Sequence, residues 1–160
     1  MSSNLPSSSR SELEGLFMGS VSALRRELRK IYDRELAPSG LSLAYAWPLV
    51  LIAEQPGMSQ RELAERLDIE GPTLVRLLHQ LAAMELVTRE QNPDDLRANT
   101  LHLTPAGRAT AKRLRRTMDG LRSRLLAGVS DDDLADALRV LESVRTSIIR
   151  GGDAALPSDD

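Results

Sequence analysis

The sequence predicts a mainly helical fold that carries one small β-hairpin, and three observations support this prediction. Hydrophobic residues make up 41% of the chain but aromatic residues only 2%, so the core must be mostly aliphatic, which favours helices packed on helices. Apolar residues recur at helical spacing in several stretches. Between residues 86 and 104, two strand-like runs separated by turn-forming residues predict a hairpin instead.

The first predicted helix extends from about residue 11 to residue 36. Ser11 and Glu14 have the spacing of a capping box, and Pro38-Ser39-Gly40 provides the stop. Residues 1–10 have little apolar surface to bury and are predicted to form a disordered tail. The apolar residues at helical spacing are Leu13, Phe17, Leu24, Leu28, Ile31 and Leu36.

Three further helices are predicted in the middle of the chain. A helix over residues 42–54 contains Pro48, expected near the first turn, where the missing N–H costs least. Ser59 and Glu62 form a second capping-box pattern, which predicts a short helix. After a turn over residues 68–71, Pro72 suits the first position of the next helix. The buried stripe of that helix is predicted to be Leu74, Leu78 and Leu81.

The hairpin follows this helix, with strands at about 86–90 and 100–103 and with Asp95 and Arg97 at its tip. Leu101 and Leu103 are expected on one face of the hairpin and His102 on the other. A capped helix, a short turn, a second helix and a stiff hairpin, in this order, have the layout of a winged helix-turn-helix. Residues 41–104 are therefore predicted to form such a unit and to bind duplex DNA.

Long amphipathic helices flank this unit. Thr104 and Pro105 predict the start of one helix, Ser130 predicts the cap of the next, and Gly151 is expected to end it. The leucine stripes of the terminal helices cannot all be buried on a compact middle unit. Residues 11–40 and 105–150 are therefore expected to be dimerisation helices of a homodimer, and residues 151–160 a disordered tail.

Charge and composition exclude several classes of protein. The net charge of −2, taken alone, argues mildly against a nucleic-acid partner. Residues 59–116 are slightly basic, with 10 Lys+Arg to 8 Asp+Glu, so a DNA partner would have to be held by a few placed arginines. The absence of cysteine excludes disulfides, cysteine-ligated zinc and thiol chemistry. No apolar run approaches the ~20 residues of a membrane span, and the serine-rich start lacks signal-peptide features. A cytoplasmic protein without a membrane partner is expected.

The polar face of the helix that begins at Pro72 is the main candidate for DNA contact. It carries Thr73, Arg76 and Gln80. Arginine can bridge the O6 and N7 acceptors of guanine, and glutamine can read adenine. The alternative is an ordinary solvated helix face, which the preceding capped helix and the following hairpin disfavour.

The hairpin tip supplies a second candidate contact. Arg97 is expected to enter the minor groove, where negative potential attracts guanidinium, and Asp95 is placed to hold its side chain. The alternative is a surface arginine in a turn. The basic residues of the helix after the hairpin are interpreted as a solvated face, with phosphate contact as the alternative. They are Lys112, Arg113, Arg115 and Arg116.

Aromatic residues cluster around the junction of the first two helices. Core packing is the default interpretation of Tyr32, Tyr45 and Trp47. The alternative is a small-molecule pocket, with Arg34 near enough in sequence to pair with an anion.

Catalysis and metal binding have no support in the sequence. The two histidines are isolated, and no glycine-rich phosphate loop, serine elbow or HExxH motif occurs. Ser59 is explained by its capping pattern. The prediction is a non-enzyme without catalytic residues, metal site or cofactor.

These residues resemble the MarR family of transcription regulators, and its SlyA branch in particular. The Asp-x-Arg wing that leads into Leu-x-Leu-Thr is the most specific part. The matching stretches are Asp33-Arg34-Glu35-Leu36 with Pro38, Ser59-Gln60-Arg61-Glu62-Leu63-Ala64, Pro72-Thr73-Leu74-Val75-Arg76 with Leu78 and Leu81, and Asp95-Leu96-Arg97 followed by Leu101-His102-Leu103-Thr104.

The resemblance implies a homodimer on a palindromic operator, with the 72–80 helix in the major groove and Arg97 in the minor groove. It also implies a response to phenolic or other aromatic carboxylate effectors, with Tyr32, Arg34, Tyr45 and Trp47 as the candidate ligand-binding residues. The candidate DNA-binding residues are Ser59, Gly71, Pro72, Thr73, Arg76, Gln80, Asp95 and Arg97.

The sequence departs from the family pattern at two positions. Glu85 stands where glycine is usual, and His79 stands where an acidic residue is frequent. The alternative function is a winged-helix module used only for protein–protein contact, which the near-neutral charge favours.

Overall fold

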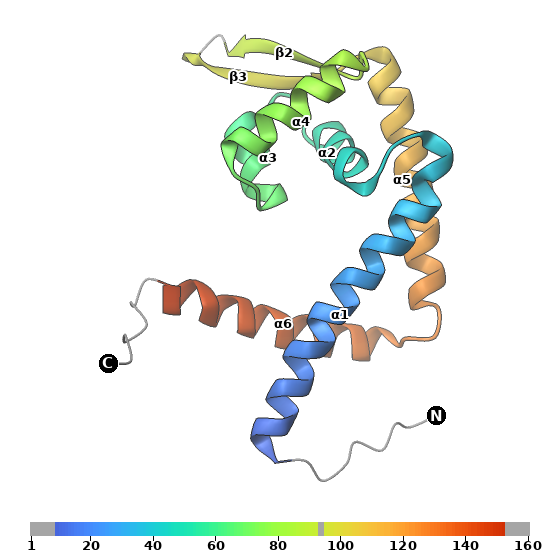
Figure 1. The fold of residues 1–160 in the computed structure, drawn as a ribbon, viewed down its shortest axis with the longest axis vertical. Helices are drawn as coiled ribbons and strands as arrows, with labels where there is room; N and C mark the ends of the chain where they lie inside the picture. The colour runs from blue at the N-terminus through green and yellow to red at the C-terminus, as the bar shows by residue number, and fades with distance from the viewer. Residues whose placement is uncertain (1–8, 93–94, 153–160) are drawn as a thin grey trace. The chain divides into compact units, whose positions relative to one another are not determined.

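The computed structural model describes residues 9–92 and 95–152, which form a mainly helical fold with one small antiparallel sheet (Figure 1). The chain divides into two compact units, Met1–Leu121 and Arg122–Asp160. The elements in order are α1 (Arg10–Leu36), the 3-10 turn η1 (Ala37–Ser39), α2 (Leu43–Glu54), β1 (Met58–Ser59), α3 (Gln60–Leu67), α4 (Gly71–Ala83), β2 (Val87–Asn92), β3 (Asp95–Leu103), α5 (Pro105–Leu126) and α6 (Asp131–Gly152).

Helix α1 begins earlier than the sequence predicted. The capping box pairs Ser9 with Glu12: the Ser9 hydroxyl accepts from the Glu12 N–H at 3.3 Å, and the Glu12 carboxylate accepts from the Ser9 N–H at 2.7 Å. The prediction of Ser11 and Glu14 as the box was wrong, because two overlapping patterns compete and the earlier one makes the helix two residues longer. Glu14 instead accepts a hydrogen bond from Arg10 at 2.6 Å.

The junction between α1 and α2 is closed by residues from both helices. Gly40, at φ 74°, ends η1 in the left-handed region, as the predicted stop requires. The Asp33 carboxylate accepts a hydrogen bond from the Leu43 N–H at 2.6 Å, so an acid from α1 caps the start of α2. Pro48 is the sixth residue of α2 and lies inside it, buried, rather than in the first turn. Pro48 has no N–H and cannot make the usual helical hydrogen bond, and the free energy gained by burying its ring in the core offsets this loss.

The sheet has the strand order β1-β3-β2, and all pairs are antiparallel. Its register places Met58 and Arg89 on either side of Leu101. Leu101 and Leu103 are buried and His102 is half-buried, which confirms the predicted alternation. The sheet thereby joins the start of α3 to the base of the hairpin.

The core of the first unit is aliphatic. One buried cluster brings apolar residues of α2, α4 and α5 together with Leu101 and Leu103 of the sheet, and Tyr32 and Tyr45 lie partly buried against it. The largest fully buried side chains in it are Leu36, Leu49, Ile52, Met58, Leu63, Leu74, Leu78, Leu81, Leu101, Leu114 and Leu121.

The predicted N-caps of the last two helices are confirmed, but the predicted end of the last helix at Gly151 is wrong. The Thr104 hydroxyl accepts from the Gly107 N–H at 2.9 Å, and the Ser130 hydroxyl accepts from the Asp133 N–H at 3.1 Å. Helix α6 continues through Gly151 to Gly152. Gly151 lacks the positive φ of a left-handed helix stop, and a glycine in helical conformation weakens a helix without ending it.

Within the described ranges, no single helix is both long enough and apolar enough to cross a membrane. Only the bent pair Arg10–Ser39 and Leu43–Glu54, at 78° to each other, reaches that length and composition together. The apolar residues of the second member are those buried in the core.

Candidate nucleic-acid interface

Helix α3 is anchored at its N-cap, Ser59. The Ser59 hydroxyl accepts from the Glu62 N–H at 3.1 Å, and the Glu62 carboxylate accepts from the Ser59 N–H at 2.8 Å, which confirms the predicted capping box. The hydrogen bond from the Ser59 backbone lowers the pKa of Glu62, and the Ser59 hydroxyl lowers it further. Ser59 also pairs with Thr100 of β3, so the position of α3 is fixed to the base of the hairpin.

The turn between α3 and α4 uses a left-handed residue. Asp68, at φ 52°, caps α3, and its N–H reaches back toward the carbonyl groups at the end of that helix. Gly71 and Pro72 are the first two residues of α4, so Pro72 takes the second helical position rather than the first. The N-cap residue Glu70 makes no side-chain cap, which leaves the N–H groups of the first turn free for another acceptor.

Helix α4 has one buried face and one exposed face. Leu74, Leu78 and Leu81 are buried, as predicted, and hold the helix to the core. All candidate contact residues of α4 are exposed, namely Gly71, Pro72, Thr73, Arg76 and Gln80. No residue of α4 carries a carboxylate. The exposed face is therefore free to approach a polyanion without like-charge repulsion from its own helix.

The end of α4 is locked by a Schellman motif. The Leu86 N–H donates to the Leu81 carbonyl at 3.0 Å, and the Glu85 N–H donates to the Ala82 carbonyl at 2.9 Å. Glu85 occupies the left-handed position of this motif at φ 57°. This conformation explains why glycine suits the position.

The hairpin is longer than the sequence indicated. Asp95 and Arg97 both lie within β3, and Asp95 pairs with Asn92 next to the turn. The interpretation of Arg97 as a turn residue was wrong, because strand pairing extends to both sides of residues 93–94. The side chains of residues 91–99 lie outside the described part, so the predicted contact between Asp95 and Arg97 stays a prediction.

Sequence reasoning missed an arginine at the base of the hairpin. Arg89 stands opposite Leu101, on the face of the sheet that meets the core. One terminal guanidinium nitrogen of Arg89 is buried and has no hydrogen-bond partner among the described residues. Side chains two residues apart in a strand lie on the same face, so the apolar Val87 was the signal that would have placed Arg89 inward.

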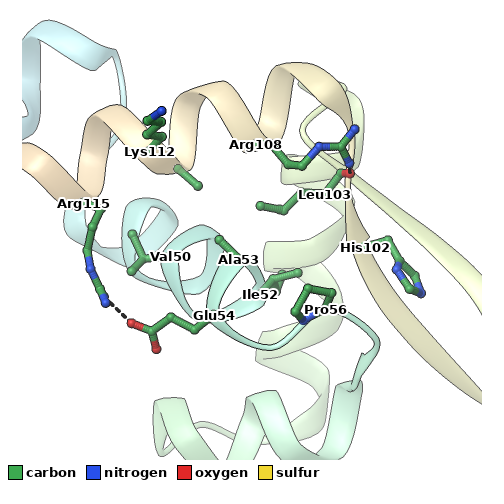
Figure 2. A pocket seen from close by; sticks show the side chains of 11 residues that line it. Val50, Ile52, Ala53, Glu54, Pro56, His102, Leu103, Arg108, Lys112 and Arg115 are labelled. Carbon is green, nitrogen blue, oxygen red and sulfur yellow. Dashed lines mark hydrogen bonds and ion pairs between the residues drawn. The ribbon is translucent and has the colours of Figure 1, made fainter.

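The basic residues of α5 are exposed, and one of them is paired across the fold. Arg115 forms an ion pair with Glu54 of α2 and a second one with Asp119 at 3.6 Å (Figure 2). Arg108 donates to the Leu103 carbonyl at 2.6 Å. Lys112, Arg113 and Arg116 are exposed as well, as the interpretation of a solvated face requires.

A hollow of about 400 Å³ lies between α2, the end of β3 and α5 (Figure 2). Its lining combines apolar residues such as Val50 and Ala111 with three cations, Arg108, Lys112 and Arg115. None of the four predicted ligand-binding residues lines it. Tyr32 and Tyr45 lie partly buried against the core, whereas Arg34 and Trp47 are exposed.

Metal-ligating residues do not gather anywhere in the described ranges 9–92 and 95–152: no group of three or more His, Cys, Asp or Glu is placed to hold an ion. The hydroxyl of Ser59 is held by its cap.

Comparison with known proteins shows what this unit is similar to. Residues 48–98 match the MarR family. A Thauera aromatica protein assigned as a transcriptional regulatory protein for the hcr operon is 36% identical over 89 residues, which cover 56% of this chain. The chain spans about half (51%) of the length of that relative.

Solved structures share the fold at low sequence identity. The S. aureus MepR–DNA complex has a TM-score of 0.75 at 20% identity and covers 82% of this chain and 97% of its own. A mutant MarR from E. coli complexed with operator DNA has a TM-score of 0.74 at 21% identity, covering 86% and 99%. S. aureus MarR in complex with salicylate and kanamycin has a TM-score of 0.76 at 23% identity, covering 87% and 94%.

The family match covers α4 and most of the hairpin, the two elements from which the interface is built. The solved neighbours have the same winged-helix fold around them. The part of the chain that builds the interface is therefore similar to the MarR family.

Proposed function

We propose that this protein is a transcriptional regulator that binds duplex DNA by placing α4 in the major groove. The observation that carries the proposal is the acid-free, exposed face of α4, held out from the core by a buried leucine stripe and followed directly by a hairpin. Two solved relatives with this fold are complexes with DNA. A regulator of this kind is not an enzyme and works in the cytoplasm, where the DNA is.

The proposed contacts divide by chemistry. Arg76 bridges the acceptors of a guanine and Gln80 reads an adenine, because their side chains match those base edges. Arg97 enters the minor groove beside the hairpin. Thr73 shares the major-groove face with Arg76 and Gln80. The Ser59 hydroxyl and the Gly71 N–H are the expected donors to backbone phosphates, whereas Pro72 has no N–H and contacts the backbone by packing alone. Asp95 acts through its hold on Arg97.

Binding as a homodimer to a palindromic operator follows from the terminal helices. Large apolar side chains are exposed on α1, including Leu16 at 55% and Leu24 at 60%. Helix α6 likewise exposes Leu138 at 66% and Ile148 at 64%. Surfaces of this kind mark protein interfaces, and two recognition helices related by a two-fold axis would meet half-sites about 10 base pairs apart.

The dimer is tested by a charge placed on α1. Leu24→Glu should yield a monomer in sedimentation equilibrium and retain the helical circular dichroism of the parent protein. Ser22→Glu is the control, because Ser22 is exposed on the opposite side of the same helix. Equal dimerisation of both variants would contradict the proposed interface.

The DNA-binding function is tested by salt dependence. Affinity for mixed genomic duplex fragments should fall steeply as salt rises, because each neutralised phosphate releases counterions. Binding that is absent or insensitive to salt would instead favour the alternative function, a winged-helix module for protein–protein contact. The net charge of −2 is the observation that favours this alternative.

A small aromatic acid is the proposed effector. The supporting observation is that a solved relative of this fold is a complex with salicylate. Tyr32, Arg34, Tyr45 and Trp47 remain the proposed ligand residues, and Trp47, 38% exposed, is the only tryptophan in the chain. Salicylate should shift Trp47 fluorescence and benzyl alcohol should not. An unchanged spectrum at millimolar salicylate would leave Trp47 a structural residue.

A further inference from the structure

The exposed face of α4 holds a further side chain that can read DNA, and the sequence analysis assigned it no role. An α-helix turns by about 100° per residue. On α4, the positions opposite the buried leucines are therefore Pro72, Arg76, His79 and Ala83. His79 lies about 45° from the centre of this face, whereas Thr73 lies about 75° from it. His79 is thus better placed for contact than one of the predicted residues.

The surroundings of His79 leave its ring available. The side chain is exposed, and it makes no hydrogen bond or ion pair with any residue that the structure describes, and the same is true of Arg76. Helix α4 has no carboxylate to compete for either side chain, and the residues that follow on this side are the small Ala82 and Ala83. A partner can therefore approach the helix closely at His79.

We propose that His79 reads the base pair next to the one that Arg76 contacts. This proposal rests on the DNA-binding function proposed above. Three residues of helix rise about 4.5 Å, which is close to the roughly 3.4 Å rise of one base-pair step. An imidazole N–H donates to acceptors such as the N7 and O6 of guanine, whereas a carboxylate at this position would pair with cytosine N4. His79 therefore directs the protein toward a purine acceptor at this step.

The test is to select bound sequences from a random duplex pool with the parent protein, Arg76→Ala and His79→Ala. Arg76→Ala identifies the base pair that Arg76 reads. His79→Ala should lose preference at the adjacent base pair, with about a fivefold loss of affinity for the best site, the size of one hydrogen bond. Affinity for mixed genomic DNA should stay the same. His102→Ala, which removes the other histidine from β3, should leave the preference at that base pair unchanged.

Two outcomes would overturn the proposal. A uniform loss of affinity across all sequences, with a shallower salt dependence, would make His79 a phosphate contact. Unchanged preference and unchanged affinity would make it a solvated residue. Both outcomes require that the parent protein selects a defined sequence, so failure of the DNA-binding function itself is recognised separately, by the absence of any selected sequence.

Discussion

The Thr104 hydroxyl donates a hydrogen bond to the backbone carbonyl of Glu85 at 2.6 Å. Glu85 lies just before β2 and Thr104 just after β3, so this bond closes the base of the hairpin. The Thr104 N–H adds a second bond, to the Leu86 carbonyl at 3.1 Å. The end of α4 and the start of α5 are thereby joined at the same point, and the hairpin projects from a fixed base (Figure 1).

Gly107 allows this close approach, and its substitution should be costly. A Cβ at Gly107 would lie 1.9 Å from the Leu86 carbonyl oxygen, a backbone atom that cannot move aside. Gly107→Ala should lower the free energy of unfolding by about 2–3 kcal/mol in urea titrations, because the helix and the hairpin base must separate. Gly19→Ala is the control: it meets nothing within 4 Å in α1 and should gain about 0.5–1 kcal/mol. Similar effects for both variants would mean that the contact does not hold the hairpin base.

Glu85 is a residue whose replacement should stabilise the protein. At φ 57° its Cβ is strained, and glycine removes that strain. Glu85→Gly should raise the free energy of unfolding by about 0.5–1 kcal/mol, after the entropic cost of glycine is subtracted. Glu85→Ala separates the two causes, because it keeps the Cβ and removes only the carboxylate. An equal gain from Ala would assign the effect to charge instead of backbone strain.

The sequence predicted features that depend on residues a few positions apart. The capping box of Ser59 and Glu62 and the leucine stripe of α4 follow from helical spacing. The alternation of Leu101, His102 and Leu103 follows from strand geometry. In each case the cause is local, so the pattern is visible in a single stretch of sequence.

Several of the features that the sequence did not predict depend on distant partners. The cap of α2 comes from Asp33, ten residues before Leu43, and replaces the local cap that Ser42 does not make. The hollow between α2 and α5 depends on packing that brings Glu54 to Arg115, 61 residues later. The short-range rules of helix and strand periodicity carry no signal for such pairs.

The lowered pKa of Glu62 predicts how acid affects α3. A carboxyl group whose pKa is lower in the folded state than its ordinary value of 4.5 stabilises the fold when the pH lies above 4.5. The contribution is lost as the pH falls through the lowered pKa. Urea unfolding between pH 6 and pH 3 should therefore show a smaller loss of stability for Glu62→Gln, which keeps an acceptor for the Ser59 N–H, than for the parent protein. Parallel curves for the two proteins would show that the cap does not depend on the charge.

Arg76 distinguishes base reading from attraction to phosphate. Because Arg76 is exposed and has no partner within the described ranges, Arg76→Ala should leave the thermal midpoint unchanged. It should weaken operator binding by about 1–3 kcal/mol in mobility shifts and relax the preference at one base pair. Arg76→Lys is the matched variant, because lysine keeps the charge but lacks the planar fork that bridges guanine. If Arg76 reads a base, the lysine variant regains affinity for mixed DNA while its preference at that base pair stays relaxed. Full recovery of the preference by lysine would make the contact one of charge alone.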